Sequence, residues 1–194
     1  MNILAVFAHP SPRCFNRDML SVVRDVAVSK SHNFVLHDLY AEKFDPVLSE
    51  TDFEAFNRSA IPPDIKAMQD DVSACDVLVV IHPIWWFGIP AVLKGWFDRV
   101  FSYGFAYGHD SRGVKPLLFG KKAVLINTAG AAEGPVYEAT GFGDAMVKLT
   151  DQGIFRFVGM DILLRRTFYE VPAAPEARRR EMLDLLRGDL QKVL

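Results

Sequence analysis

The stretch HPIWWFGIPAVLKGWFDRVFSYGFAY, residues 82–107, says most about how this chain folds. It follows an apolar run, residues 77–81, that is typical of a strand buried on both faces. Pro83, two tryptophans and Phe87 come next, and Pro90 then opens an amphipathic helical pattern. A strand, an aromatic loop and a helix start therefore follow each other directly. At the carboxyl end of a parallel strand, they offer a flat heterocycle a stacking surface and free backbone N–H groups.

Working outward from this stretch, strand and helix patterns alternate along the rest of the chain. Strands are expected at residues 1–8, 33–40, 76–81, 122–127 and 161–170. Helices are expected after residue 16 and at residues 50–57, 64–73, 91–101, 143–157 and 176–194. Five strands that alternate with helices, without an internal repeat, predict an α/β fold with a doubly wound parallel sheet.

Bulk composition narrows the classes of protein that fit. A chain of 194 residues is long enough for one domain, residues 1–194, and short for two. Half of the residues are apolar and 24% are charged, which excludes disorder, and a net charge of −2 argues against nucleic-acid binding. No segment reaches the ~20 uninterrupted apolar residues of a membrane span, and the N-terminus lacks the pattern of a signal peptide. A cytoplasmic protein is the expectation.

The chain has two cysteines, Cys14 and Cys75. Two are too few for a disulfide framework, and their spacing does not match a metal site, so no metal is expected. Cys75 opens a buried strand and is expected to be inert. Cys14 belongs to a polar loop and is expected to be partly accessible.

The loop after the first strand, residues 9–16, reads HPSPRCFN. Its prolines restrict the turn, while Ser11, Arg13 and Asn16 place donors around the start of a helix, which suits a phosphate or pyrophosphate. Two plainer explanations stand beside this one, because Asn16 is also a good helix cap and Arg13 can simply be solvated. Neither a Walker sequence nor a GxGxxG sequence occurs, which argues against a nucleoside triphosphate or a Rossmann-type cofactor.

The segment WFGIPAVLKGWFDRVF, residues 86–101, resembles the NAD(P)H:quinone oxidoreductases, the DT-diaphorase branch of the flavodoxin-like flavoproteins. A weaker resemblance extends over residues 1–178. It implies a flavodoxin-like three-layer sandwich with a five-stranded parallel sheet of order 2-1-3-4-5. It also implies a bound flavin, NAD(P)H as co-substrate, a homodimer, and the two-electron reduction of quinones by ping-pong hydride transfer, with azo dyes and nitroaromatics as further acceptors.

The resemblance implies a set of flavin-binding residues on three loops that should converge at one edge of the sheet. These are His9, Phe15, Asn16, Pro83, Ile84, Trp85, Trp86, Phe87, Thr128, Ala129 and Gly130, and the donor pattern of the first loop adds Arg13. A further match, Arg178, corresponds to an arginine near the adenine of FAD and is the main reason to expect FAD, with FMN as the alternative. In the run of Arg178 with Arg179 and Arg180, a solvated helix face is the plainer explanation.

Tyr137 matches a tyrosine that works with a histidine as a proton relay in relatives, and it is the predicted catalytic residue. The expected histidine is missing from the downstream segment GFGD, residues 141–144. Quinone reduction needs protons as well as a hydride, so the source is Tyr137, water or another acid. His82 and His109 are candidates, although His82 can merely end its strand and His109 lies in a predicted polar loop.

The resemblance also implies a substrate wall that both subunits of a dimer share. Its residues in this chain are Trp86, Phe87, Tyr107, His109 and Phe157.

Two functions from other classes compete with the enzyme. A flavodoxin-like electron carrier would have the same fold, but such carriers have strongly acidic docking surfaces that a net charge of −2 does not supply. The other alternative, from the resemblance, is a regulatory flavoprotein subunit of a potassium-efflux system.

Overall fold

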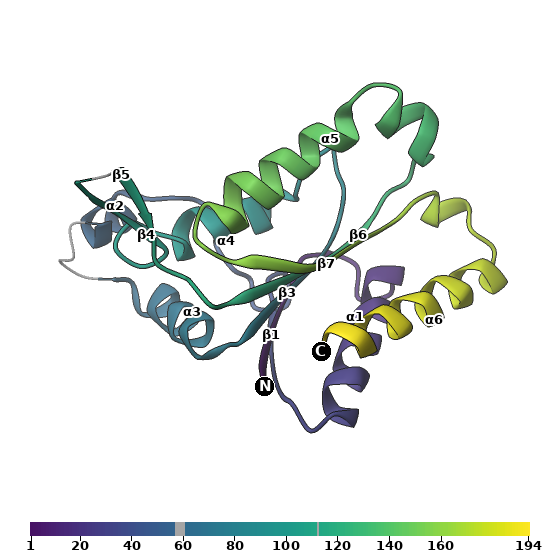
Figure 1. The fold of residues 1–194 in the computed structure, drawn as a ribbon, viewed down its shortest axis with the longest axis horizontal. Helices are drawn as coiled ribbons and strands as arrows, with labels where there is room; N and C mark the ends of the chain where they lie inside the picture. The colour runs from purple at the N-terminus through teal and green to yellow at the C-terminus, as the bar shows by residue number, and fades with distance from the viewer. Residues whose placement is uncertain (57–60, 112) are drawn as a thin grey trace.

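A computed structural model describes residues 1–56, 61–111 and 113–194 of the chain. A five-stranded parallel sheet forms the centre, and Figure 1 shows helices packed on both of its sides. Its strands are β1 (Asn2–Phe7), β2 (Asn33–Asp38), β3 (Val77–Pro83), β6 (Lys122–Thr128) and β7 (Asp161–Phe168). They lie in the order β2-β1-β3-β6-β7, so the predicted α/β fold and the order 2-1-3-4-5 of its five strands are confirmed.

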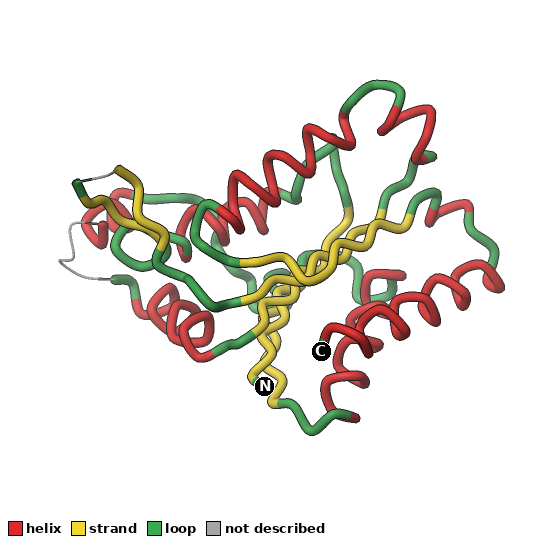
Figure 2. The backbone as a smooth tube through the Cα atoms, in the orientation of Figure 1, coloured by secondary structure: helices red, strands yellow, loops and turns green. Residues whose placement is uncertain are grey.

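Two helical layers cover the sheet, as the tube in Figure 2 makes plain. One layer consists of α1 (Phe15–Ser29) and α6 (Glu176–Val193), which pack against each other and against the same face. The other contains α3 (Pro63–Ala74), α4 (Ala91–Val100) and the π-helical segment η2 (Lys148–Arg156). The chain is therefore a three-layer sandwich.

Strand β1 shows why the central strands are apolar throughout. Ile3, Ala5 and Phe7 belong to the core under α1 and α6, whereas Leu4 and Val6 belong to the core under α3 and α4. Because successive side chains point to opposite faces and both faces are covered, every position needs an apolar residue.

Helix α4, which follows the aromatic loop, is fixed from outside by the long connection before α3. A Cβ atom on Gly95 would lie 2.1 Å from the Pro46 carbonyl oxygen, so only glycine allows the connection to pass this close. Arg99 binds Asp52 with its Nε 3.0 Å from Oδ1, and Asp52 lies in α2 (Glu50–Phe56). That helix was predicted to reach Asn57, which lies outside the described residues.

The structure corrects two local expectations. Strands β4 (Tyr107–Asp110) and β5 (Gly113–Pro116) form an antiparallel pair in which His109 lies opposite Val114, so His109 is not in a loop. The two strands are largely exposed, so they lack the apolar alternation from which a strand could be predicted. Residues 143–157 are not one regular helix, because α5 (Phe142–Val147) continues into the wide turns of η2. The loops also contain the short segments η1 (Glu133–Glu138) and η3 (Val171–Ala173).

Both cysteines are free thiols. Burial raises the pKa of Cys75 to about 11, so this thiol is inert at neutral pH, as predicted. Cys14 is partly exposed, also as predicted. None of the helices in the described ranges is both long enough and apolar enough to cross a bilayer.

Candidate functional site

A cavity of about 510 Å³ lies at the carboxyl edge of the sheet, where the strand order reverses between β1 and β3. The loops after β1, β3 and β6 line it, together with η3 and the first turn of α6. Its lining comprises His9, Arg13, Cys14, Phe15, Asn16, Pro83, Ile84, Trp85, Thr128, Ala129, Gly130, Val171, Pro172 and Arg179. Most of the residues predicted to bind the cofactor therefore lie together.

Local hydrogen bonds hold the loop after β1 in a tight turn. The Ser11 N–H donates to His9 Nδ1 over 3.0 Å, and the Arg13 N–H donates to Ser11 Oγ over 3.2 Å. Burial lowers the pKa of His9, so its ring is neutral at physiological pH. Cys14 occupies the position before α1 and makes no side-chain cap, which leaves the first amides of the helix without a side-chain partner. Such a helix start favours an anionic group.

Asn16 is the most direct sign that the cavity can bind a polar ligand. Its side chain is only 3% exposed, and its Oδ1 accepts a hydrogen bond from Thr128 Oγ1 over 2.8 Å. Its Nδ2 is buried without a partner. Leaving such a donor unpaired costs about 1–3 kcal/mol, and a polar ligand in the cavity would remove that cost. Asn16 is the second residue of α1, so it is not the helix cap.

The aromatic loop after β3 is a tight two-residue turn. Trp85 and Gly88 exchange both backbone hydrogen bonds, at 3.1 and 3.0 Å. Between them, Trp86 and Phe87 have φ angles of 50° and 60°, the left-handed region that costs a non-glycine residue roughly 1–2 kcal/mol. Strain of this kind is maintained where the backbone geometry serves a site.

The three aromatic side chains of this turn point in different directions. Trp85 lines the cavity, with its ring centroid 6.3 Å from that of His9. Trp86 is 96% exposed and does not line the cavity. Phe87 turns the other way and stacks on Phe142 with 4.1 Å between ring centroids. The structure thus separates three neighbours that the sequence places along one edge.

Tyr137 does not line the cavity itself but packs behind its wall, in a cluster with the cavity-lining residues Ile84 and Ala129. Its ring centroid is 5.1 Å from that of Tyr169. Burial raises the pKa of Tyr137, so its hydroxyl is protonated at neutral pH. Phe142 belongs to the segment that lacks the relay histidine, and its ring is held on Phe87. His82 is buried behind the loop, where burial holds its pKa at about 4.

Three of the residues predicted for the substrate wall, Tyr107, His109 and Phe157, form a second group outside the cavity, whereas Trp86 and Phe87 belong to the aromatic turn. Tyr107 and Phe157 are in contact, with ring centroids 5.4 Å apart, and both line a groove of about 220 Å³ beside α4. His109 lies 5.9 Å from Tyr103 between ring centroids. None of Tyr107, His109 and Phe157 lines the first cavity.

Of the arginines at the start of α6, a different one from the predicted residue reaches the cavity. Arg178 is exposed, pairs with Glu181 at 3.0 Å, and lines a separate cavity of about 470 Å³ at the end of β7. Arg179 lines the first cavity, donates from Nη2 to the Val171 carbonyl, and has a buried Nε without a partner. The resemblance indicated Arg178, and the run of three arginines in the sequence does not show which of them faces the cavity.

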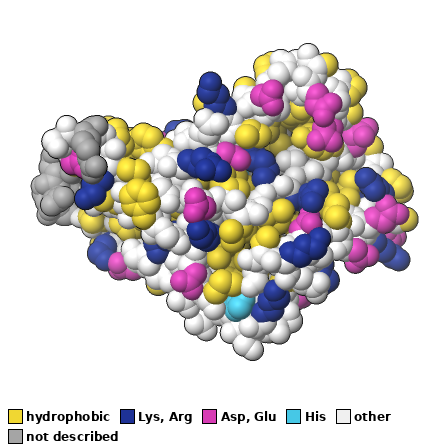
Figure 3. Space-filling model, viewed as in Figure 1, with side chains coloured by type: hydrophobic (Ala, Val, Ile, Leu, Met, Phe, Trp, Pro, Cys, Tyr) yellow, Lys and Arg dark blue, Asp and Glu magenta, His cyan; other side chains and the backbone are white. Residues whose placement is uncertain are grey.

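Charges elsewhere on the surface are mixed. The face in Figure 3 shows basic and acidic side chains interspersed around apolar patches. Within the described residues, no group of three or more His, Cys, Asp or Glu side chains is placed to hold a metal ion.

A doubly wound parallel sheet with a cavity at its switch point, lined by amide donors, a helix start and an aromatic wall, defines a protein that binds a nucleotide-type cofactor. Residues 1–188 match the model of the flavodoxin-like fold family, and the chain belongs to this family. The chain is 34% identical to NAD(P)H dehydrogenase [quinone] 1 of Cavia porcellus, over 93% of this chain and 72% of that protein.

Solved structures give the same picture. The NAD(P)H:quinone oxidoreductase from Methanothermobacter marburgensis superposes with a TM-score of 0.88 at 27% identity, over 99% of this chain and 96% of that one. General stress protein 14 from Treponema denticola, in complex with FMN, superposes with a TM-score of 0.71 at 27% identity, over 100% of this chain and 98% of that one. The predicted relationship to NAD(P)H:quinone oxidoreductases is confirmed.

Proposed function

We propose that this protein is a flavin-dependent NAD(P)H:quinone oxidoreductase. The observation that carries the proposal is the cavity between the ends of β1, β3 and β6, in which the buried Nδ2 of Asn16 has no partner. The names of the relatives support the reaction class, and the cavity supports the location that we propose for the site. Azo and nitro aromatic compounds are further acceptors in this proposal.

The residues present fit a flavin nucleotide. His9, Arg13, Phe15 and Asn16 surround the start of α1 and would hold the phosphate end. The backbones of Pro83, Ile84 and Trp85 would line one side of the ring, with Trp86 and Phe87 in the same turn. On the other side, Thr128, Ala129 and Gly130 allow a close approach of the backbone. When bound, the flavin supplies the hydride chemistry, and the protein supplies binding and orientation.

FMN is the flavin that we propose. The FMN-bound Treponema protein supports it. The expectation of FAD rested on Arg178, which lines a cavity other than the one that contains Asn16. Arg179 lines the Asn16 cavity and is the arginine that we assign to the cofactor, while Arg178 keeps its proposed role only if FAD proves to be bound.

Tyr137 is the residue that we assign to proton transfer. Its phenol is protonated at neutral pH and packs against Ile84 and Ala129, which line the cavity. It can therefore donate a hydrogen bond or a proton toward a bound ring. His109 belongs to the second group of predicted residues, and His82 is buried behind the aromatic turn. We therefore assign neither histidine to act with Tyr137 in proton transfer within one chain.

We propose that the active enzyme is a homodimer in which the second copy completes the substrate wall. Tyr107, His109 and Phe157 do not line the Asn16 cavity of their own chain, whereas Trp86 is almost fully exposed beside it. Mixed dimers test this: a Trp86→Ala chain and a Tyr107→Ala chain, each inactive alone, should recover about half of the sites when combined. No recovery in a proven heterodimer would contradict shared sites.

The central experiment identifies the chromophore and follows its electrons. Purified protein should be yellow, and mass spectrometry should identify the released chromophore as FMN. The bound flavin should bleach when NADH or NADPH is added without oxygen. A quinone should then restore the colour, and steady-state NAD(P)H oxidation should follow ping-pong kinetics. Poor turnover would instead favour an electron carrier or a regulatory subunit. Protein that stays colourless after incubation with FMN and with FAD would end the proposal.

A further inference from the structure

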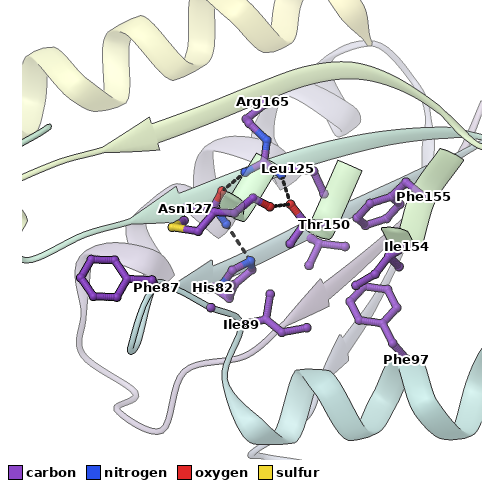
Figure 4. A pocket seen from close by; sticks show the side chains of 13 residues that line it. His82, Phe87, Ile89, Phe97, Leu125, Asn127, Thr150, Ile154, Phe155 and Arg165 are labelled. Carbon is purple, nitrogen blue, oxygen red and sulfur yellow. Dashed lines mark hydrogen bonds between the residues drawn. The ribbon is translucent and has the colours of Figure 1, made fainter. Parts of the chain in front are cut away.

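A small closed pocket lies behind the aromatic turn, on the face of the sheet that α4 and η2 cover. Figure 4 shows it between Phe87, Ile89, Phe97 and Phe155. Its volume of about 20 Å³ leaves room for about one water molecule. Most of its lining is apolar, and the polar members are His82, Asn127, Thr150 and Arg165.

Arg165 in β7 is the first member of a chain of hydrogen bonds through this pocket. Asp151 of η2 holds its guanidinium, with Nε 3.1 Å from Asp151 Oδ2, and Thr150 accepts from Nη2. Its Nη1 donates to Asn127 Oδ1 over 3.3 Å. A guanidinium can only donate, so the Asn127 amide must turn its oxygen toward Arg165 and its NH₂ group away.

The remaining bonds then have only one possible direction. Asn127 Nδ2 donates to His82 Nε2 over 2.7 Å, so Nε2 carries no proton. The proton of the ring is therefore on Nδ1, which donates to the Pro83 carbonyl oxygen over 2.8 Å. A protonated His82 would place an N–H against the Asn127 NH₂ group, and this structure excludes that arrangement.

The last acceptor belongs to the wall of the cofactor cavity. The peptide between Pro83 and Ile84 is held at its oxygen by His82 and at its N–H by the Thr128 carbonyl, at 2.7 Å. Pro83, Ile84 and Thr128 all line the cavity that contains Asn16. Through Asn127 and His82, the fixed guanidinium of β7 thus sets the position of a peptide in the cavity wall, across three neighbouring strands.

We propose that His82 is a positioning residue for the cofactor, which holds the Pro83–Ile84 peptide in the orientation that the flavin ring requires. This inference rests on the proposed function. His82 itself touches neither the cavity nor the reacting atoms, and it acts through the peptide and through the turn that follows. The small size of the pocket adds to the effect, because it has room for no more than about one water molecule to replace a lost partner.

The first test compares flavin binding by His82→Phe and His82→Gln. Phenylalanine keeps a ring but removes both nitrogens, whereas glutamine keeps one donor and one acceptor. For His82→Phe we expect the Kd for FMN, and for FAD in parallel, to rise about tenfold or more, because Pro83 O and Asn127 Nδ2 both lose their partner. The visible spectrum and midpoint potential of bound FMN should also shift, and His82→Gln should recover most of each effect.

A matched control is His32→Phe. His32 also binds a carbonyl, that of Leu194, at 2.9 Å, but it lies at the opposite edge of the sheet. Its effect on the Kd for FMN should stay within twofold. If His82→Phe folds and binds FMN with unchanged affinity, spectrum and potential, the inference is wrong while the proposed function stands. Wild-type protein that binds neither flavin would overturn both.

A second variant covers the case in which His82→Phe does not fold. In Asn127→Asp, Arg165 keeps an acceptor, but the side chain can no longer donate to His82 Nε2. Among the residues that line the pocket, Arg165 is the only other charged group, and Asp151 already pairs with it. The new carboxylate should therefore favour a proton on Nε2 near neutral pH. Nitrogen-15 NMR of the flavin-free proteins should show Nδ1–H alone in the wild type and both N–H groups in the variant, which should bind FMN more weakly. Wild-type protein with Nε2–H would overturn the assignment.

Discussion

Two arginines on the same side of the sheet, Arg99, which is buried, and Arg165, which is partly exposed, belong to opposite kinds of hydrogen-bond network. Arg99 ends in a closed set of acceptors: the Asp52 carboxylate, the Asp45 carbonyl at 2.8 Å and the Asp64 carboxylate. Arg165 is also neutralised by a carboxylate, Asp151, but one of its donors continues through neutral side chains to the cavity wall. The Arg99 network thus holds the connection before α3 in place, whereas the Arg165 network extends to the wall of the candidate cavity.

The two arginines show that similar ion pairs can have different roles. Removing an ion pair from water is expensive, and a buried pair seldom adds much net stability. Once the pair has formed, however, removing either partner leaves an uncompensated charge and strongly destabilises the fold. We therefore expect Arg99 and its partners to affect folding, and the Arg165 network to affect ligand binding as well.

The largest effect should follow from Asp52→Ala. This change leaves the guanidinium of Arg99, which is 8% exposed, without its main carboxylate. The free energy of unfolding should fall by about 3–5 kcal/mol, the usual result of breaking a buried pair. Urea denaturation measures it, and the folded fraction should still bind FMN normally. As a control, Asp70→Ala removes only the exposed pair with Lys66 and should cost less than about 1 kcal/mol. Equal losses in the two variants would contradict the contrast.

The two networks should also lose stability in different pH windows. His82 has a pKa of about 4 in the folded chain against 6.5 when free, so the unfolded chain binds more protons between these values. Stability should be complete above pH 6.5 and fall by up to ~3 kcal/mol as the pH drops to 4, at ~1.36 kcal/mol per pKa unit.

Asp52 behaves differently. Burial alone would raise its pKa, but hydrogen bonds from Ser49 and Arg99 hold it below the usual 3.8, so its contribution is lost only in stronger acid. The free energy of unfolding, measured by denaturation from pH 7 to 3, should therefore depend less steeply on pH in His82→Phe between pH 6.5 and 4. A slope unchanged by that substitution would show that other groups cause it.

A smaller and more selective effect is expected for Asn16→Ala. Its Nδ2 has no partner in the chain, so the free energy of unfolding should change by no more than about 1 kcal/mol, the value of the bond from Thr128. The Kd for FMN should rise about tenfold, because the variant loses a donor that only the ligand satisfies. Titration of apoprotein with FMN measures this, and Thr128→Val controls for the lost hydroxyl contact. Unchanged affinity would place the cofactor elsewhere.

The smallest effect should distinguish the two arginines at the start of α6. Arg179→Met should weaken FMN binding a few-fold, since Arg179 lines the cavity with a free buried Nε. Arg178→Met should leave FMN binding unchanged, because Arg178 does not line this cavity. Its exposed pair with Glu181 should contribute less than about 1 kcal/mol to stability. Measuring both variants with FAD adds a further test. A loss of FAD binding confined to Arg178→Met would restore the adenine role of this residue.

Much of the fold was open to prediction from the sequence. The apolar run of β3 and the prolines at 83 and 90 marked a strand, a loop and a helix, and all three lie where expected. The order of the strands came from the resemblance, because periodicity does not distinguish one strand order from another. The hairpin of β4 and β5 was not predicted, because its short exposed strands have little apolar pattern.

The candidate site was only partly predictable, for a reason that the residues make clear. Loop residues after β1, β3 and β6 were found because parallel strands deliver their carboxyl ends to one edge. The directions of Trp86 and Phe87 were not found, because left-handed φ angles turn adjacent side chains apart. Arg165, which completes the network under the site, lies in a strand with no local sign of its role.

Local periodicity and turn chemistry were enough to locate the five strands of the central sheet, most of the helices, and the loops that carry polar and aromatic side chains. Which of those side chains share a cavity depends on the tertiary structure. It brought Asn16 to Thr128, linked Arg165 to Pro83 through two other residues, and chose Arg179 over Arg178. Contacts between residues so far apart depend on how whole elements pack, and no local pattern encodes that packing.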